Sequence, residues 1–223
     1  MKATLLCSLL GLVLLAGCDQ KSDVPVGGTE VETKSETQST PPGTPSAPQT
    51  NNTNEVAIIK TSEGDMVIEF WPDVAPQTVA SFKKLARNDS YDGTIFHRVV
   101  KGFMIQGGDL VSKDPAKEAE YGKGDPGFTL PAEFSTRQHV RGVVSMARMG
   151  HDINSASSQF FIVLGDATFL DGQYTAFGKL IKGDDVLEKI GNTPVKFYGD
   201  ERSRPTTRIE IQDVEIVPRD QIQ

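Results

Sequence analysis

Eight short runs rich in β-branched and aromatic residues follow one another from residue 55 onward. They are VAIIK (56–60), MVIEFW (66–71), TIFHRVV (94–100), FMIQG (103–107), GVVSMA (142–147), SQFFIVL (158–164), TAFGKLI (175–181) and TRIEIQDVEIV (207–217). Turn-forming residues such as Ser62-Glu63-Gly64-Asp65 and Asp171-Gly172 separate these runs. So many short strands favour either a closed barrel or a sandwich.

Two segments between the predicted strands have helical periodicity instead. Residues 76–87 begin with a proline suited to a first helical turn. Residues 184–190 start on a capping aspartate, Asp184, and stop at Gly191. The first segment spaces its apolar residues as one face of a helix, at Val79, Phe82, Leu85 and Ala86. We expect two short helices that plug the open ends of a barrel.

The first 17 residues read as a signal peptide. Lys2 provides a basic start, an apolar run covers residues 5–15, and that run is too short to cross a hydrocarbon core about 30 Å thick. The ending LAGC (15–18) resembles a bacterial lipobox, which implies a lipid on Cys18. The protein would then be anchored to a membrane of the bacterial cell envelope, facing the periplasm or the exterior. An ordinary secreted protein with a chance cysteine is the alternative.

Residues 18–54 are predicted to be a lipidated cysteine followed by a disordered tether. The stretch after Cys18 has no aromatic residue, no Leu and no Ile, and is dense in Thr, Ser, Pro and Gly. Such a segment buries too little apolar surface to offset its ordering entropy. As a flexible coil it would have a root-mean-square reach of about 30 to 35 Å. It would therefore lift a domain clear of the lipid headgroups.

Charge and side-chain spacing exclude several functions. The net charge of −7 without a basic cluster argues against nucleic-acid binding. His97, His139 and His151 have no metal-ligand spacing, so we expect no metal and no other cofactor. With Cys7 in the signal peptide and Cys18 lipidated, the domain would hold no thiol. Ser145 lacks a GxSxG context, so a covalent intermediate is not expected either.

The stretch FHRVVKGFMIQGGD (96–109) holds an arginine and a glutamine among apolar residues. A three-residue turn at 101–103 would set Arg98 opposite Gln106 on one face of a hairpin. A two-residue turn would place His97 on that face instead. The sequence leaves both registers open.

This stretch is very similar to the signature of the cyclophilins, which are peptidyl-prolyl cis-trans isomerases. The similarity continues in WPDVAPQTVASF (71–82), GVVSMAR (142–148), SSQFFIVL (157–164) and FLDGQYTAFGKL (169–180). The resemblance implies a mainly β fold, a closed eight-stranded antiparallel β-barrel capped by two α-helices. We place this domain at residues 55–220.

The resemblance also implies the site residues. Arg98 matches the family's catalytic arginine and Gln106 the glutamine beside it. The residues that match the lining of the proline pocket are Phe103, Met104, Phe161 and Leu170. Ala147 and Arg148 fall where the family holds the substrate backbone, although many members have asparagine at the second position.

Two further pocket positions depart from the common pattern. Phe169 replaces a tryptophan that is important for cyclosporin, and Tyr174 replaces a common histidine. We therefore expect cyclosporin to be a ligand of weakened affinity, while catalysis is retained.

The predicted function is isomerisation of Xaa-Pro bonds in exported proteins as they fold. In this reaction a hydrogen bond from Arg98 would weaken the amide resonance without a covalent intermediate. The alternative is a proline-peptide binding module or holdase that uses the same groove with weak turnover. Measuring whether Arg98 is needed for catalysis distinguishes the two.

Overall fold

A computed structural model describes residues 54–124 and 126–222 of the 223-residue chain. The predicted signal peptide, Cys18 and all of the predicted tether except Asn54 lie outside the described residues. Within the described ranges, no helix has the length and apolar character that a membrane crossing requires.

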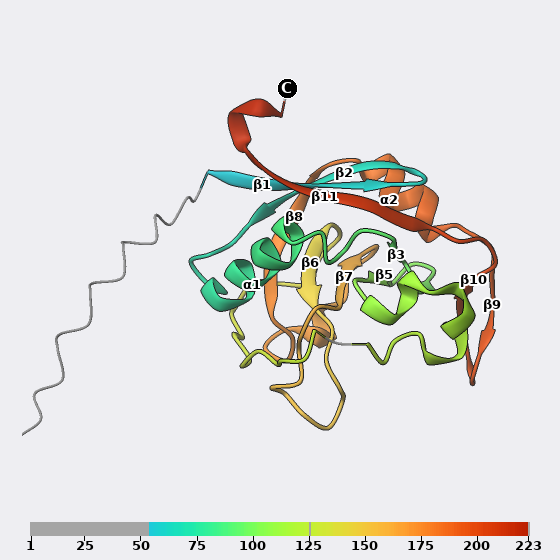
Figure 1. The fold of residues 1–223 in the computed structure, drawn as a ribbon. Helices are drawn as coiled ribbons and strands as arrows, with labels where there is room; N and C mark the ends of the chain where they lie inside the picture. Colours follow the sequence, from blue (N-terminus) through green and yellow to red (C-terminus); the bar gives the residue numbers. More distant parts are fainter. Residues whose placement is uncertain (1–53, 125, 223) are drawn as a thin grey trace, which may run out of the picture. The chain divides into compact units, whose positions relative to one another are not determined.

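Nine strands form one antiparallel sheet in the described part of the chain (Figure 1). They are β1 (Glu55–Thr61), β2 (Gly64–Phe70), β3 (Thr94–Ile95), β4 (Arg98–Val100), β5 (Met104–Gly107), β6 (Val143–Met146), β7 (Phe160–Val163), β8 (Ala176–Lys182) and β11 (Glu210–Pro218). Each of the eight predicted segments overlaps at least one of these strands. The predicted mainly β, antiparallel fold is therefore confirmed.

The sheet curls so that both of its ends belong to one stretch of chain. The strand order is β3-β11-β1-β2-β8-β6-β7-β5-β4, and β3 and β4 are consecutive in the sequence. Residues 94–100 first pair with β11 and then, after Phe96 and His97, pair with β5. The predicted single strand at 94–100 is thus two short strands, because the segment changes partner midway. The pairing between neighbouring strands is therefore interrupted at Phe96 and His97, whereas a closed barrel of eight strands was expected.

The two predicted α-helices are present, as α1 (Pro76–Arg87) and α2 (Asp184–Gly191), and they pack against strands of the sheet. The capping role predicted for Asp184 is wrong. Gly183 occupies the N-cap in the left-handed conformation, at φ 88°, and makes no side-chain cap bond. Asp184 is instead the first helical residue, where its carboxylate accepts a hydrogen bond from Arg141 Nε at 2.9 Å. A negative charge in the first turn is still favourable to the helix dipole.

Several short elements were not predicted. A two-stranded sheet of β9 (Val195–Tyr198) and β10 (Glu201–Pro205) follows α2. Six of its nine residues are exposed or half-buried and four are charged, so the segment lacks the apolar alternation that identifies a strand in sequence. The 3-10 helices are η1 (Leu110–Lys113), η2 (Pro115–Glu120), η3 (Thr168–Leu170) and η4 (Arg219–Gln221).

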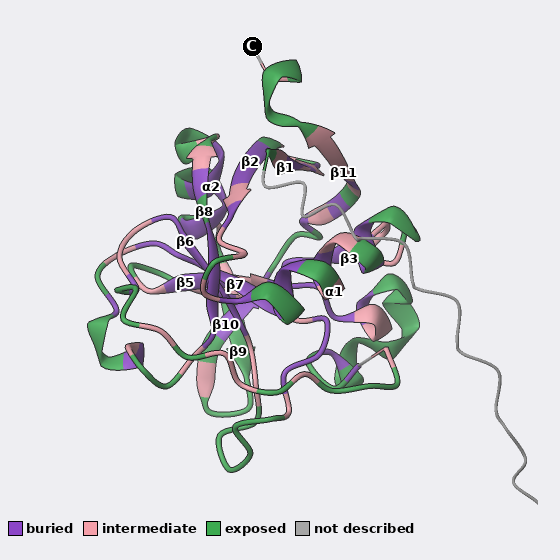
Figure 2. Cartoon of the chain, turned by 90° about the vertical axis from the view of Figure 1, so that its left-hand side faces the viewer, coloured by how far each residue is buried: buried purple, intermediate pink, exposed green. Residues whose placement is uncertain are grey.

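The main core lies between α1 and the sheet, where Figure 2 shows buried residues along the strands and on the inner side of the helix. Phe82 of α1 stands at its centre. Its ring centroid lies 4.9 Å from that of Tyr91, 5.5 Å from Phe160 and 5.4 Å from Phe177. Aromatic burial of this kind is among the largest contributions to a core. It fixes α1 on the face of the sheet opposite the cavity described below.

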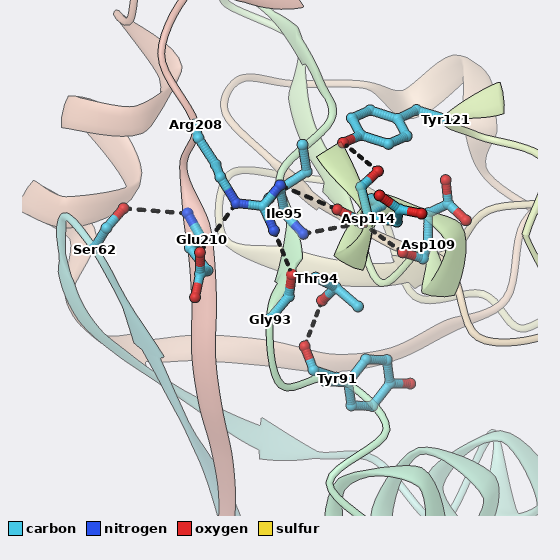
Figure 3. Close-up of polar contacts among 11 residues, drawn as sticks. Ser62, Tyr91, Gly93, Thr94, Ile95, Asp109, Asp114, Tyr121, Arg208 and Glu210 are labelled. Carbon is cyan, nitrogen blue, oxygen red and sulfur yellow. Dashed lines mark hydrogen bonds and ion pairs between the residues drawn. The ribbon is translucent and has the colours of Figure 1, made fainter. Parts of the chain in front are cut away.

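Arg208 joins β11 to the segment that leads into β3 (Figure 3). Its guanidinium donates to the carbonyl of Gly93 at 2.6 Å and to the carbonyl of Ser112 at 3.1 Å. Ser112 Oγ in turn accepts a hydrogen bond from the backbone of Ile95 at 3.1 Å. These bonds hold the chain in place shortly before it reaches Arg98.

Candidate active site

The β4–β5 hairpin has the first of the two registers that the sequence allowed. Arg98 pairs with Gln106, and Val100 pairs with Met104 across a three-residue connection. Gly102 in that connection has φ 74°, which L-residues with a side chain rarely adopt. Arg98 and Gln106 therefore share one face of the sheet.

Strand alternation divides the sheet into two apolar faces. Val99, Ile105 and Ile162 face the main core. Their neighbours Met104 and Phe161 face the other way, into a second apolar cluster. Because Gln106 pairs with Phe161 of β7, the row that begins at Arg98 continues across the sheet on this second face.

This second face carries a cavity of about 280 Å³. All ten residues predicted for the site line it, namely Arg98, Phe103, Met104, Gln106, Ala147, Arg148, Phe161, Phe169, Leu170 and Tyr174. They come from β4, β5 and the turn between them, from β7 and η3, and from the loops that follow β6 and η3. The structure thus brings the predicted residues together, and their individual roles remain predictions.

The floor of the cavity is apolar and buried. Met104, Phe161 and Leu170 are at most 7% exposed and belong to the second apolar cluster. The Phe161 ring meets Tyr174 edge-on at 5.9 Å between centroids and stacks against His139 at 6.2 Å. A floor built this way has the size and chemistry to hold a small saturated ring.

The Arg98 guanidinium forms one polar wall. Its Nη1 donates to Gln106 Oε1 at 3.2 Å and lies 3.9 Å from Met104 Sδ. Its Nε and Nη2 donate to the two carboxylate oxygens of Glu201, each at 2.6 Å. The side chain of Arg98 is 33% exposed, so the ion pair leaves the cation open to the cavity.

A chain of amides supports Arg98 from behind. Gln106 Nε2 donates to Gln159 Oε1 at 3.1 Å, and Gln159 Nε2 donates to the carbonyls of Gly122 and Gly124 at 3.0 Å each. Asp109 holds the same loop, because its carboxylate accepts hydrogen bonds from the backbone N–H groups of both glycines. Asp109 thus positions the loop on which the amide chain ends.

Glu201 and Gln159 were both missed by sequence reasoning. Gln159 lies inside the motif SSQFFIVL, next to the strand that carries Phe161, and this proximity was the available signal. Glu201 is separated from Arg98 by 103 positions and lies on a hairpin with no apolar pattern. No local feature of the sequence points to that pair.

The rim is aromatic and cationic. Phe169 is 64% exposed, and its ring centroid lies 5.4 Å from that of Phe103. The guanidinium carbon of Arg148 lies 4.5 Å from the centroid of the Tyr174 ring. Arg148 also donates to backbone carbonyls, including that of Gln173 at 3.1 Å. Its cation is therefore engaged in holding the loops at the mouth.

Beneath Phe161 lies a hydrogen-bonded row with the residue types of a serine hydrolase. His139 Nε2 is 3.0 Å from Ser145 Oγ, and His139 Nδ1 is 2.9 Å from Asp171 Oδ1. Ser145 is 0% exposed and His139 is 1% exposed, so a substrate has no access to this hydroxyl. The backbone N–H of His139 also donates to Asp171, which lowers the pKa of that carboxyl. This row of residues supports the floor of the cavity, because His139 stacks against Phe161.

His97 is buried immediately before β4. Neither ring nitrogen has a hydrogen-bond partner among the described residues. Burial lowers the pKa of His97 to about 4, with Arg204 and Arg98 adding to the shift and Asp109 opposing it. The imidazole is therefore neutral at pH 7. Across residues 54–124 and 126–222, no three His, Cys, Asp or Glu side chains are grouped to hold a metal ion.

A family model described as cyclophilin type peptidyl-prolyl cis-trans isomerase/CLD matches residues 56–216. A probable peptidyl-prolyl cis-trans isomerase of Brucella abortus (strain 2308) is 46% identical over 151 residues, covering 66% of this chain and 75% of the relative. The isomerase CYP23 of Arabidopsis thaliana is 42% identical over 154 residues, covering 69% of this chain and 67% of the relative. A cyclophilin type isomerase of Cryptosporidium parvum, crystallised in the presence of the dipeptide Ala-Pro, gives a TM-score of 0.64 at 33% identity. That match covers 73% of this chain and 98% of the solved chain.

Proposed function

Because this chain belongs to the cyclophilin-type peptidyl-prolyl cis-trans isomerases and has their activity, we propose that Arg98 supplies the rate acceleration. The guanidinium binds the twisted Xaa-Pro amide more tightly than the planar one. No covalent intermediate is formed.

The physical basis is the resonance of the peptide bond. Rotation costs about 18 to 20 kcal/mol because the nitrogen lone pair is delocalised into the carbonyl. At the twisted state the prolyl nitrogen becomes pyramidal and can accept a hydrogen bond, which the planar amide does not offer. A donor aimed at that nitrogen therefore stabilises the transition state selectively. Arginine suits this role because it remains charged at any working pH.

One observation carries the proposal: the Nη1 edge of Arg98 borders the same cavity as Met104 and Phe161. A proline ring held on the apolar floor would have its nitrogen beside the cation while the preceding carbonyl turns. Gln106 keeps Nη1 in place through its 3.2 Å hydrogen bond. The relative solved with Ala-Pro present supports a proline-containing peptide as the occupant of this cavity.

Substitution of the arginine tests the mechanism. We expect Arg98→Ala to lower kcat/KM for a short Xaa-Pro peptide about 100-fold, the scale of losing one transition-state donor. The control is Arg87→Ala, which removes an exposed arginine on α1 that pairs with Glu55. Protease-coupled or NMR exchange assays give the rates. Wild-type turnover in Arg98→Ala would refute the mechanism.

We propose further that the enzyme acts on proline-containing segments of exported proteins from a membrane anchor at Cys18. The support is the signal-like residues 1–17, the lipobox-like LAGC and the polar stretch that follows. Replacing Cys18 by serine is expected to move the protein from the membrane fraction to the soluble exported fraction. Identical fractionation of the two forms would rule out the lipid anchor while leaving the isomerase mechanism intact.

Cyclosporin binding is proposed to be weak, because Phe169 stands where many family members have tryptophan. Phe169 is 64% exposed at the rim, where a ligand can reach it, and its phenyl ring offers a smaller apolar surface than an indole would. We expect Phe169→Trp to raise cyclosporin affinity, as measured by inhibition of peptide isomerisation. Equal inhibition of both proteins would show that this position does not set the affinity.

A further inference from the structure

The β9–β10 hairpin lies against the catalytic strand. Figure 1 shows it at the same end of the domain as β3 and β5, and β10 packs against β4, which carries Arg98. Gly199 and Asp200 form its turn, with Gly199 at φ 59°. Glu201 is the first residue of β10, so the hairpin delivers its carboxylate directly to the site.

The Glu201 carboxylate binds one side of the Arg98 guanidinium. It accepts from both Nε and Nη2 of Arg98 at 2.6 Å, the paired geometry that makes arginine–carboxylate contacts directional. The hydrogen bond from Arg98 holds the pKa of Glu201 below its usual value. The carboxylate is therefore ionised at neutral pH, and the contact is an ion pair.

The hairpin is itself anchored, so Glu201 is held in place. Tyr198 lies opposite Glu201 across the hairpin, and its hydroxyl donates to the carbonyl of Ala119 at 2.9 Å. The guanidinium carbon of Arg204 lies 4.1 Å from the centroid of the Tyr198 ring and 5.0 Å from that of Tyr121. Arg204 is 4% exposed and Tyr121 6%, whereas Tyr198 is 39% exposed, so the stack connects the exposed hairpin to buried residues.

Two effects of the carboxylate on catalysis oppose each other. It attenuates the positive potential of Arg98, and it fixes the direction of the remaining donors. A guanidinium has five N–H groups. Glu201 takes two of them and Gln106 takes one, which leaves one on Nη2 and one on Nη1; the latter has only the weak acceptor Met104 Sδ, at 3.9 Å. Ordering a free arginine side chain costs considerable rotamer entropy. The contact with Glu201 already orders the side chain of Arg98. Because a transition-state hydrogen bond depends on direction, orientation decides the outcome.

We propose that Glu201 is a positioning residue for the isomerase: it fixes the Arg98 guanidinium so that its free Nη donors face the proline cavity. The proposal rests on the role of Arg98 proposed above. It concerns a residue that touches the arginine and not the substrate, so its loss should lower kcat and leave peptide affinity nearly unchanged.

The experiment compares three single variants by NMR exchange and protease-coupled assays. We expect Glu201→Ala to lower kcat about 10-fold with less than about a twofold change in peptide affinity. Glu201→Gln should lie between wild type and alanine, because a carboxamide offers only one acceptor to the fork. The matched control is Asp200→Asn, which makes the same change of charge at the exposed neighbouring position and should retain wild-type rates. Thermal unfolding of each variant checks that the fold is kept.

Measuring Glu201→Ala in the Arg98→Ala protein distinguishes the positioning role of Glu201 from the proposed role of Arg98 on which it rests. In Arg98→Ala, adding Glu201→Ala should cause no further loss, because the group that is positioned is gone. The Arg98 Nε–H resonance should also be protected from solvent exchange in wild type and Asp200→Asn, and lose that protection in Glu201→Ala.

Three results would overturn the role of Glu201: wild-type kcat in Glu201→Ala, a higher kcat, or an equal loss in the Arg98→Ala background. A higher kcat would mean that the carboxylate restrains the enzyme by neutralising the cation. If Arg98→Ala alone retains full activity, the proposed mechanism fails first, and the positioning role fails with it.

Discussion

Gln106 faces Arg98 directly across the β4–β5 ladder and accepts a hydrogen bond from its Nη1 at 3.2 Å. The carboxamide nitrogen of Gln106 donates at the same time to Gln159. Since an amide has one acceptor oxygen and one donor nitrogen, the second contact fixes which end meets the arginine. The orientation of the Arg98 guanidinium thus depends on Gln159, which lies on the far side of Gln106.

Removing the far end of this chain is expected to impair catalysis. In Gln159→Ala, the Gln106 amide is free to rotate, and we expect kcat/KM to fall about fivefold, since a hydrogen-bonded network loses order when one member is deleted. Gln77→Ala, at an exposed position of α1, serves as the control. A coupled assay on a short Xaa-Pro peptide gives the ratio. Equal rates in the two variants would show that Gln106 needs no support.

The buried histidine predicts a loss of stability in mild acid. The pKa of His97 is about 4 in the folded protein, against an ordinary value of 6.5, so the unfolded chain binds the proton more tightly. Its contribution to stability is fully present above pH 6.5 and is lost as pH falls toward 4. The difference of pKa corresponds to about 3 kcal/mol.

Urea unfolding at about pH 7 and about pH 4.5, on either side of the ordinary histidine pKa, measures this effect. His97→Gln should lose less stability than wild type between the two pH values, whereas His151→Gln, at an exposed position, should follow wild type. The same pH dependence in wild type and His97→Gln would assign the acid sensitivity to other groups.

Replacing Gly102 in the hairpin turn is expected to lower the free energy of unfolding through backbone strain alone. Its φ is 74°, and a Cβ added at this position would have no other atom within 4 Å, so Gly102→Ala introduces strain without a clash. We expect a loss of about 1 kcal/mol in the free energy of unfolding. Gly150→Ala is the matched change, because Gly150 has no positive φ and equally open surroundings. A stability loss of equal size in both variants would contradict the strain argument.

The rim predicts different roles for the ring and the hydroxyl of Tyr174. Its ring supports Arg148 at 4.5 Å and Phe161 at 5.9 Å. We expect Tyr174→Leu to raise KM about threefold, the scale of a half-exposed cation–π contact. Tyr174→Phe keeps the ring and should leave KM nearly unchanged. An equal rise of KM in both variants would show instead that the hydroxyl donates to the substrate.

Much of the fold and the cavity was predictable, because alternation and short motifs encode them locally. The eight strand segments and both helices follow from apolar period and turn residues, as α1 with its buried Val79, Phe82 and Leu85 shows. The ten cavity residues followed from motif resemblance, and the structure places them around one cavity. Contacts set by tertiary geometry were not predictable. Glu201 meets Arg98 only after a polar hairpin folds against β4, and no periodicity marks such a hairpin.

The pairing of β1 with β11 has a consequence for how the chain acquires its structure. Lys60 donates to Asp213 across a sequence separation of 153 residues, so the first strand finds its partner at the other end of the domain. Contacts of such long range slow folding, because the closure entropy of the intervening chain must be overcome first. During synthesis the early strands must wait, unpaired on that side, until residues 210–218 emerge. Because β11 is the last of the nine strands along the chain, the strand that lies between β3 and β1 is also the last to be synthesised.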